Sequence, residues 1–145
     1  MILSVRIVLD TSVLVAAIRS KTGASRLLIQ MVLQCKLRPL VSVPLVLEYE
    51  SVATRPEHVG HSDLDSEEIV DIVKAFCTIA EHVHVGNRLR PQLADPNDEF
   101  VLEAAVYGNA DAIVTMNIGD FLIAGRRFGI ETLAPGQALM RLREL

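Results

Sequence analysis

Acidic residues that follow predicted strands are the most chemically distinctive feature of this sequence. Asp10 comes directly after the apolar run 7–9, while Asp98 and Asp120 lie beyond two later predicted strands. In a parallel sheet, ligands bind outside the carboxyl ends of the strands, so we expect these carboxylates to converge at one edge. Crowded carboxylates repel one another unless a cation neutralises them, and oxygen ligands suit Mg²⁺ or Mn²⁺. The pattern therefore predicts a site for one or two metal ions.

A fourth acid is expected from the helix after the second predicted strand. Glu48 and Glu50 both fall on the borders of that helix's apolar face. A helical wheel therefore leaves both candidates open.

Each acid also has a purely structural interpretation. Asp10 could cap a helix or simply end a strand. The run Asp95-Pro96-Asn97-Asp98 is typical of a helix N-terminus, with Asp95 as the N-cap and Pro96 at the first position. Asp120 alone could be a turn residue. Glutamates on helices more often belong to solvated faces; those here are Glu48, Glu50 and Glu103.

Strands and helices that could position these acids alternate along the chain. Apolar runs predict strands at residues 6–10, 40–43, 83–85, 112–115 and 130–133. Helical spacing predicts helices at residues 11–18, capped by Thr11 or Ser12, and at 24–35, 44–53, 69–79, 96–107, near 121 and from 135. The polar segment 57–66 is the most loop-like. This alternation favours an α/β fold, a single-domain three-layer α/β/α sandwich over residues 1–145 with a central, mainly parallel sheet.

Composition narrows the class of protein. Half of the 145 residues are hydrophobic and the net charge is −4, which argues against a general nucleic-acid coat protein but not against a nuclease. We find no signal peptide and no apolar run long enough for a membrane helix. Cys35 and Cys77 lie in predicted helices and are expected to be buried, reduced thiols. These features indicate a cytoplasmic protein.

The histidines offer a competing metal site. His58 and His61 fall in the predicted loop, and His82 and His84 share one face of the third predicted strand. Zinc needs three or four well-placed ligands, and no further cluster completes either pair. We therefore expect solvated histidines.

Four segments together resemble the PIN-domain family, which includes VapC-like toxins of toxin–antitoxin operons. They occur in the expected order and span nearly the whole chain. The segments are Val8-Leu9-Asp10-Thr11-Ser12, Ser42-Val43-Pro44-Leu45-Val46-Leu47-Glu48-Tyr49, Asp95-Pro96-Asn97-Asp98-Glu99-Phe100-Val101-Leu102-Glu103-Ala104-Ala105 and Ala110-Asp111-Ala112-Ile113-Val114-Thr115-Met116-Asn117-Ile118-Gly119-Asp120-Phe121.

The resemblance implies a set of site residues and an activity. The family's metal-binding acids correspond to Asp10, Glu48, Asp98 and Asp120, so the resemblance selects Glu48 over Glu50. Its polar orienting residues correspond to Thr11 or Ser12 and to Asn117, where many relatives have Asp. The implied reaction is hydrolysis of RNA phosphodiester bonds with Mg²⁺ or Mn²⁺. Whether Glu50, Asp95 or Glu103 assists stays open.

The resemblance also implies partners. These are a single-stranded or structured RNA substrate, a cognate antitoxin that covers the site and a second copy of the chain in a homodimer. The RNA would follow a cationic track. Its candidate residues are Arg19, Lys21 and Arg26, or Arg88 and Arg90.

The sequence also bears on three other functions. A phosphoacceptor receiver domain needs extra acids after the first strand and a lysine near the last, and this chain has only Lys21, Lys36 and Lys74. A haloacid-dehalogenase-like phosphatase needs a second acid two residues after Asp10, where Ser12 stands. The remaining alternative is a catalytically inactive PIN-like module that binds RNA or protein.

Overall fold

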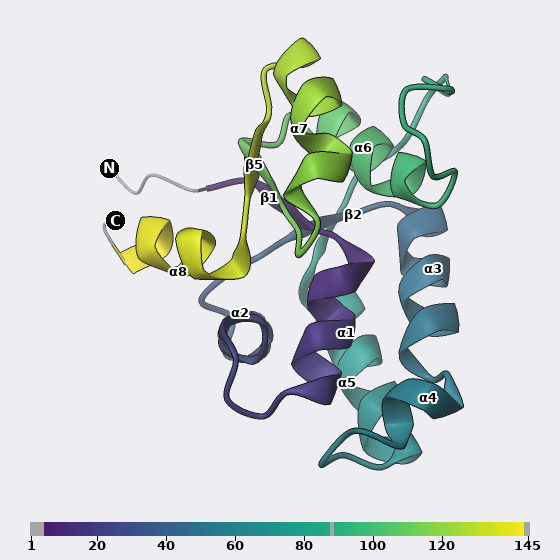
Figure 1. Cartoon of the computed structure of the whole chain (residues 1–145), viewed down its shortest axis with the longest axis vertical. Coiled ribbons are helices and arrows are strands. Elements are labelled where there is room, and N and C mark those ends of the chain that lie inside the picture. The colour runs from purple at the N-terminus through teal and green to yellow at the C-terminus, as the bar shows by residue number, and fades with distance from the viewer. Residues whose placement is uncertain (1–4, 88, 144–145) are drawn as a thin grey trace.

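The computed structural model describes residues 5–87 and 89–143, in which short strands alternate with helices (Figure 1). The strands are β1 (Ile7–Leu9), β2 (Leu40–Val41), β3 (Glu81–His82), β4 (Ala112–Val114) and β5 (Glu131–Leu133). The helices are α1 (Thr11–Arg19), α2 (Ala24–Leu33), α3 (Val43–Ala53), α4 (Pro56–Val59), α5 (Ser66–Ile79), α6 (Asp98–Tyr107), α7 (Ile118–Arg127) and α8 (Pro135–Arg143).

The strands form a parallel sheet in two parts. One part has the order β1-β4-β5 and the other pairs β2 with β3, and every pairing is parallel. Because β1 also lies beside β2, the spatial order is β3-β2-β1-β4-β5. The chain moves outward from β1 in one direction and later in the other, so a topological switch point lies between β1 and β4. The expected α/β class with a mainly parallel sheet is confirmed.

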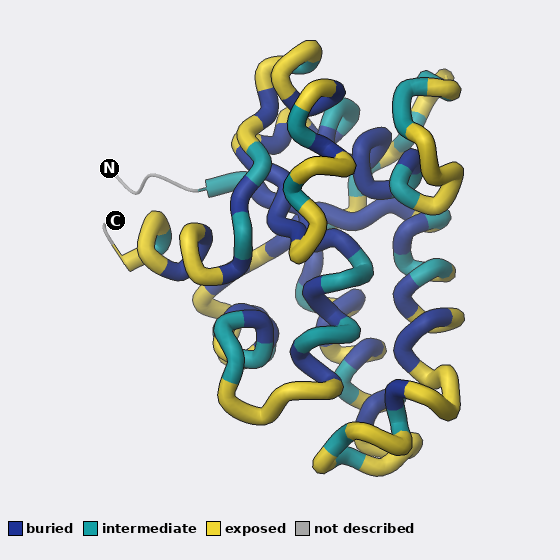
Figure 2. The backbone as a smooth tube through the Cα atoms, viewed as in Figure 1, coloured by how far each residue is buried: buried dark blue, intermediate teal, exposed yellow. Residues whose placement is uncertain are grey.

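Helices pack around the strands in two groups (Figure 1). One group consists of α1, α2, α3 and α5, which pack against one another. In the other, α6 packs on β1 and β4 and α7 packs on β5. The strands β1, β2 and β4 and the inner faces of these helices are buried (Figure 2), and the core is aliphatic apart from a few aromatic rings. Within the described ranges, no helix has the length and apolar character needed to cross a membrane.

The third strand differs most from the prediction. The alternation Val83-His84-Val85 predicts a strand there, but β3 is Glu81–His82. Hydrogen bonds from Glu81 N to Pro39 O and from Val83 N to Val41 O, both 2.8 Å, hold it beside β2. The Glu81 carboxylate is paired with the Arg6 guanidinium at 2.7 Å, which allows a charged residue in the strand.

Three further local predictions also need correction. Helix α6 begins at Asp98 rather than Pro96, and its N-cap is Asn97 rather than Asp95. The short helix α4 overlaps the start of the predicted loop 57–66. His58, on this helix, is buried, so the expectation of solvated histidines is wrong for His58.

The two cysteines have different environments. Cys77 lies in α5 and is buried, which raises the pKa of its thiol to about 11. Cys35 is exposed, lies beyond the end of α2 and has a positive φ of 59°. The prediction of a buried helical thiol is therefore wrong for Cys35.

Candidate active site

Asp10 lies where β1 ends and α1 begins, and its backbone is fixed on both sides. Its N–H donates to Val114 O at 2.8 Å, and its carbonyl accepts from Val13 N at 2.9 Å. The residue occupies the N-cap position of α1, but its side chain makes no capping hydrogen bond. Asp10 is only 5% exposed, so the structure buries a carboxylate that capping does not require.

Two hydroxyl groups hold the Asp10 carboxylate in one orientation. Ser12 Oγ donates to Oδ2 at 2.6 Å, and Thr115 Oγ1 donates to the same oxygen at 2.7 Å. The hydroxyls are themselves held by backbone donors, because Met116 N donates to Ser12 Oγ at 3.1 Å and Asn117 N donates to Thr115 Oγ1 at 2.9 Å. No hydrogen bond to Oδ1 is found among the described residues. That oxygen is therefore left for another ligand.

These contacts identify which predicted orienting residues touch Asp10. Ser12 does so directly, whereas no side-chain hydrogen bond of Thr11 is found within the described part of the chain. Asn117 contributes its backbone N–H, and as the N-cap of α7 it makes no side-chain capping bond. Thr115 was missed by the sequence analysis. Its position at the end of an apolar strand is the same signal that indicated Asp10.

Asp98 is the first residue of α6 and faces several other carboxylates. Burial and, next, the negative charges of Asp10, Asp95, Asp120 and Glu99 together raise its pKa to about 7. The structure thus brings Asp10, Asp98 and Asp120 into one region of negative potential at the carboxyl edge of the sheet. Asp120 itself is exposed in the first turn of α7.

The fourth predicted acid lies on α3, which is anchored next to the end of β1. Glu48 precedes Tyr49, whose buried hydroxyl donates to Leu9 O at 2.5 Å. Glu48 is half-buried, and it is not among the neighbouring charges that raise the pKa of Asp98. Glu50 is exposed and lies close enough to Cys77 in α5 to help raise the thiol pKa. The two glutamates therefore have different surroundings.

The donor set suits a magnesium-type ion better than a closed metal cage. Across residues 5–87 and 89–143, no three Asp, Glu, His or Cys side chains come close enough to hold a metal ion between them. Mg²⁺ is commonly bound through one or two carboxylates, with waters and substrate phosphates completing the shell. Asp10, with its free Oδ1, and Asp98, surrounded by other carboxylates, could supply the one or two carboxylate ligands of such an ion. Zinc, which needs three or four close ligands, does not fit.

Two glutamates of α6 are buried beside this region. Glu99 and Glu103 are 2% and 3% exposed, and both accept hydrogen bonds from the segment before the helix. The interpretation of Glu103 as part of a solvated face is therefore wrong.

Several of the arginines considered for a cationic track already have partners. Arg26 is ion-paired with Asp63 at 2.7 Å, and Arg90 contacts Glu103 at 3.4 Å. Arg19 is exposed, with one nitrogen 3.4 Å from Nδ1 of His58, and Lys21 is exposed. Arg88 lies outside the described residues.

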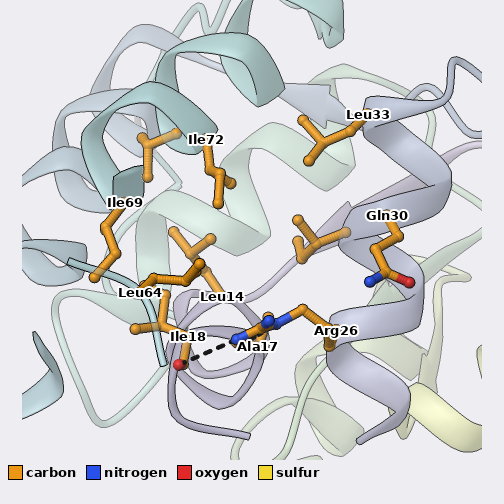
Figure 3. A pocket seen from close by; sticks show the side chains of 11 residues that line it. Leu14, Ala17, Ile18, Arg26, Gln30, Leu33, Leu64, Ile69 and Ile72 are labelled. Carbon is orange, nitrogen blue, oxygen red and sulfur yellow. Dashed lines mark hydrogen bonds between the residues drawn. The ribbon is translucent and has the colours of Figure 1, made fainter. Parts of the chain in front are cut away.

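An apolar pocket of about 170 Å³ lies between α1, α2 and α5 (Figure 3). Its lining is aliphatic except for Arg26 and Gln30, and Arg26 donates to Ile18 O at 3.4 Å across one wall. None of the predicted acids lines this pocket. It is therefore a separate feature from the carboxylate site.

Comparisons with known proteins agree with this architecture. The sequence profile of the PIN domain matches residues 6–119. Comparison with curated protein sequences gives no match. Among solved structures, the crystal structure of VapBC2 from Rickettsia felis, bound to a DNA fragment from their promoter, is similar with a TM-score of 0.54. The sequences are 15% identical, and the alignment covers 89% of this chain and 98% of that chain, so the likeness concerns the fold.

Proposed function

This chain belongs to the PIN-domain family, and from that membership we propose that it is a metal-dependent ribonuclease. In this proposal it cleaves RNA phosphodiester bonds and serves as the toxin of a type II toxin–antitoxin system. The membership itself confirms the resemblance seen in the sequence.

One observation carries the proposed activity. The buried Asp10 carboxylate is fixed through Oδ2 by two hydroxyls, while Oδ1 has no partner among the described residues and Asp98 lies in its field. Placing a half-buried carboxylate close enough to a buried one for the two to repel is unfavourable unless a cation offsets the repulsion. The arrangement therefore supports a site that is completed by Mg²⁺ or Mn²⁺.

The residues of the site would have different roles in hydrolysis. Asp10 and Asp98 would hold the ion, with Asp120 and Glu48 completing the site or positioning water. Ser12 and Thr115 keep Asp10 in one rotamer, so no reorientation is needed when ion and substrate arrive. A bound Mg²⁺ or Mn²⁺ would activate the attacking water and neutralise charge on the phosphate.

The apolar pocket supports the proposed antitoxin partner. Its aliphatic walls suit a non-polar side chain of another protein. The homodimer is proposed on the resemblance, and the exposed Ile123 and Met140 offer apolar surface for it. The free cysteines suit a reducing compartment, which supports the cytoplasm as the site of action.

The decisive test is RNA cleavage with Asp10→Asn as the matched variant. We expect wild-type protein to cleave single-stranded RNA in Mg²⁺ or Mn²⁺ and to lose cleavage in a chelator. Asp10→Asn keeps the size of the side chain and should lose cleavage while remaining folded. Metal-independent cleavage, or equal cleavage by the variant, would contradict the proposal.

A catalytically inactive module that binds RNA or protein is the second candidate. It is favoured by the absence, within the described residues, of three ligands close enough to hold one ion. RNA binding that is unchanged by metal and by Asp10→Asn, with no cleavage under any condition, would select it.

A further inference from the structure

Glu99 and Glu103 are two carboxylates that the proposed chemistry does not use. They lie four residues apart on α6, so they share one face of the helix, and both are buried. Glutamate is almost never fully buried without a partner. Their partners therefore indicate what the burial achieves.

Glu99 closes the loop that precedes its own helix. Its Oε1 accepts hydrogen bonds from Gln92 N and Leu93 N, both at 2.7 Å. Bonds to an ionised acceptor are roughly twice as strong as neutral ones. Residues 93–98 are thereby held as a closed loop, in which Asp95 Oδ1 accepts from Asn97 N at 2.9 Å. This loop places Asp95 and Asp98 at the same end of α6.

Glu103 provides a second attachment one turn further along α6. Its Oε2 accepts from Leu89 N at 3.3 Å, and its Oε1 lies 3.4 Å from Nη2 of Arg90. The Arg90 guanidinium also lies 4.6 Å from the centre of the Phe100 ring. Segment 89–93 therefore runs along α6 and is fixed at two points.

The same segment also contacts α7. Gln92 Nε2 donates to Leu89 O at 2.8 Å, which holds the Gln92 side chain. Arg127, at the end of α7, donates to Oε1 of Gln92. Segment 89–93 thus bridges α6 and α7, the helices that carry Asp98 and Asp120.

We propose that Glu99 and Glu103 are positioning residues of the carboxylate site, which hold segment 89–93 and thereby fix Asp95 and Asp98 relative to Asp120. The inference deepens the proposed function and rests on it. A second observation supports it: Glu99 Oε2 is buried and has no hydrogen-bond partner among the described residues. Retaining a carboxylate with one unsatisfied oxygen is costly, which favours a role beyond filling space.

The experiment compares Glu99→Ala and Glu99→Gln with wild type, and uses Glu67→Ala as the control. Glu67 is an exposed glutamate in the first turn of α5. Amide hydrogen exchange at Gln92 and Leu93 measures how firmly segment 89–93 is held by Glu99. Calorimetric titration measures the affinity of the carboxylate site for Mn²⁺. Neither readout requires RNA cleavage.

In Glu99→Ala we expect exchange at Gln92 and Leu93 to accelerate about 10- to 100-fold, because both amides lose a charged acceptor. We expect Mn²⁺ affinity to fall about 10- to 100-fold, the usual effect of losing a partner that orients metal ligands. Glu99→Gln keeps one acceptor oxygen and should give smaller changes in the same direction. Glu67→Ala should change neither quantity. If Glu99→Ala does not fold, Glu99→Gln carries the test.

Unchanged amide exchange in the Glu99 variants would contradict the claim that Glu99 holds segment 89–93. Faster exchange with wild-type Mn²⁺ affinity would overturn the positioning role. Either result is compatible with the proposed ribonuclease function, provided that the wild-type protein binds Mn²⁺ and cleaves RNA. Wild-type protein that neither binds Mn²⁺ nor cleaves RNA would instead overturn the proposed function, and this inference with it.

Discussion

The Thr115 hydroxyl donates a hydrogen bond to Oδ2 of Asp10 across 2.7 Å, joining two residues that are 105 positions apart. The contact follows from the register of β1 and β4, in which Leu9 lies opposite Val114. Each of the two residues comes next after the paired strand ends. Parallel pairing therefore places the carboxylate beside the hydroxyl that orients it.

We expect Thr115→Val to weaken both the fold and the site. The substitution removes one of the two hydroxyl bonds to Asp10 and the acceptor of the Asn117 N–H. A hydrogen bond to a charged group contributes about 1.5–3 kcal/mol, so we expect a loss of about 2 kcal/mol in the free energy of unfolding. Metal-dependent cleavage should fall about 10- to 100-fold. Chemical denaturation and RNA cleavage assays measure these effects.

Thr132→Val is the matched control for that variant. Thr132 lies on β5, and its Oγ1 is buried without a hydrogen-bond partner among the described residues. Replacing such a hydroxyl by a methyl group should be neutral or slightly stabilising. Equal losses of stability and cleavage in the two variants would argue against a special role for Thr115.

Asp98 makes the stability of the metal-free protein depend on pH. Its folded-state pKa is about 7, above the ordinary value of 3.8. Between these values the folded state binds more protons than the unfolded state, so stability falls as pH rises through this range. Asp98→Asn removes the free-energy cost of ionising this carboxyl group in the folded protein. In chelator at pH 8, we expect the variant to be more stable by about 1 kcal/mol, a figure reduced because the side chain is half-exposed.

The pH series supplies the check on this prediction. The difference in free energy of unfolding between Asp98→Asn and wild type should grow from pH 4 to pH 7 and stay constant above. Below pH 4 it should vanish, because Asp98 is then protonated in both states. A constant difference at all pH values would show that packing, rather than charge, separates the two proteins.

Local sequence was sufficient to predict the alternation of elements and the position of Asp10. The run Ile7-Val8-Leu9 is apolar throughout because β1 is buried on both faces, and such a run is visible without any partner. The same reasoning predicted β4 and placed Asp120 near its end.

Contacts between distant residues explain what the sequence did not reveal. Glu81 is in a strand because Arg6, 75 positions away, neutralises it. Glu99 and Glu103 are on a buried face because a loop supplies their donors. Helical periodicity assigns such charged residues to solvent, since it contains no information about partners from other segments.

Tyr49→Phe tests how α3 is attached to the end of β1. The substitution removes the hydroxyl that donates to Leu9 O and keeps the edge-to-face contact with Phe76, whose ring centre lies 5.6 Å away. We expect a loss of about 1–2 kcal/mol in the free energy of unfolding, because a buried carbonyl loses a donor. Tyr107→Phe, which removes the hydroxyl contact to Asn87 O in a loop, should cost less. A larger loss in the Tyr107 variant would contradict this view of α3.

Glu48→Gln and Glu50→Gln separate the two glutamates that the helical wheel could not. Glu50 lies near Cys77, so Glu50→Gln should leave Mn²⁺ affinity unchanged and lower the pKa of the Cys77 thiol. Glu48 is not among the charges that raise the pKa of Asp98, so we expect its role to be indirect, through bound water. Glu48→Gln should therefore lower Mn²⁺ affinity by about tenfold or less, at the weak end for residues outside the ion's direct contacts. Asp10→Asn should lower it further. Calorimetric titration of the three variants gives the order, and a greater loss in Glu50→Gln than in Glu48→Gln would reverse the assignment.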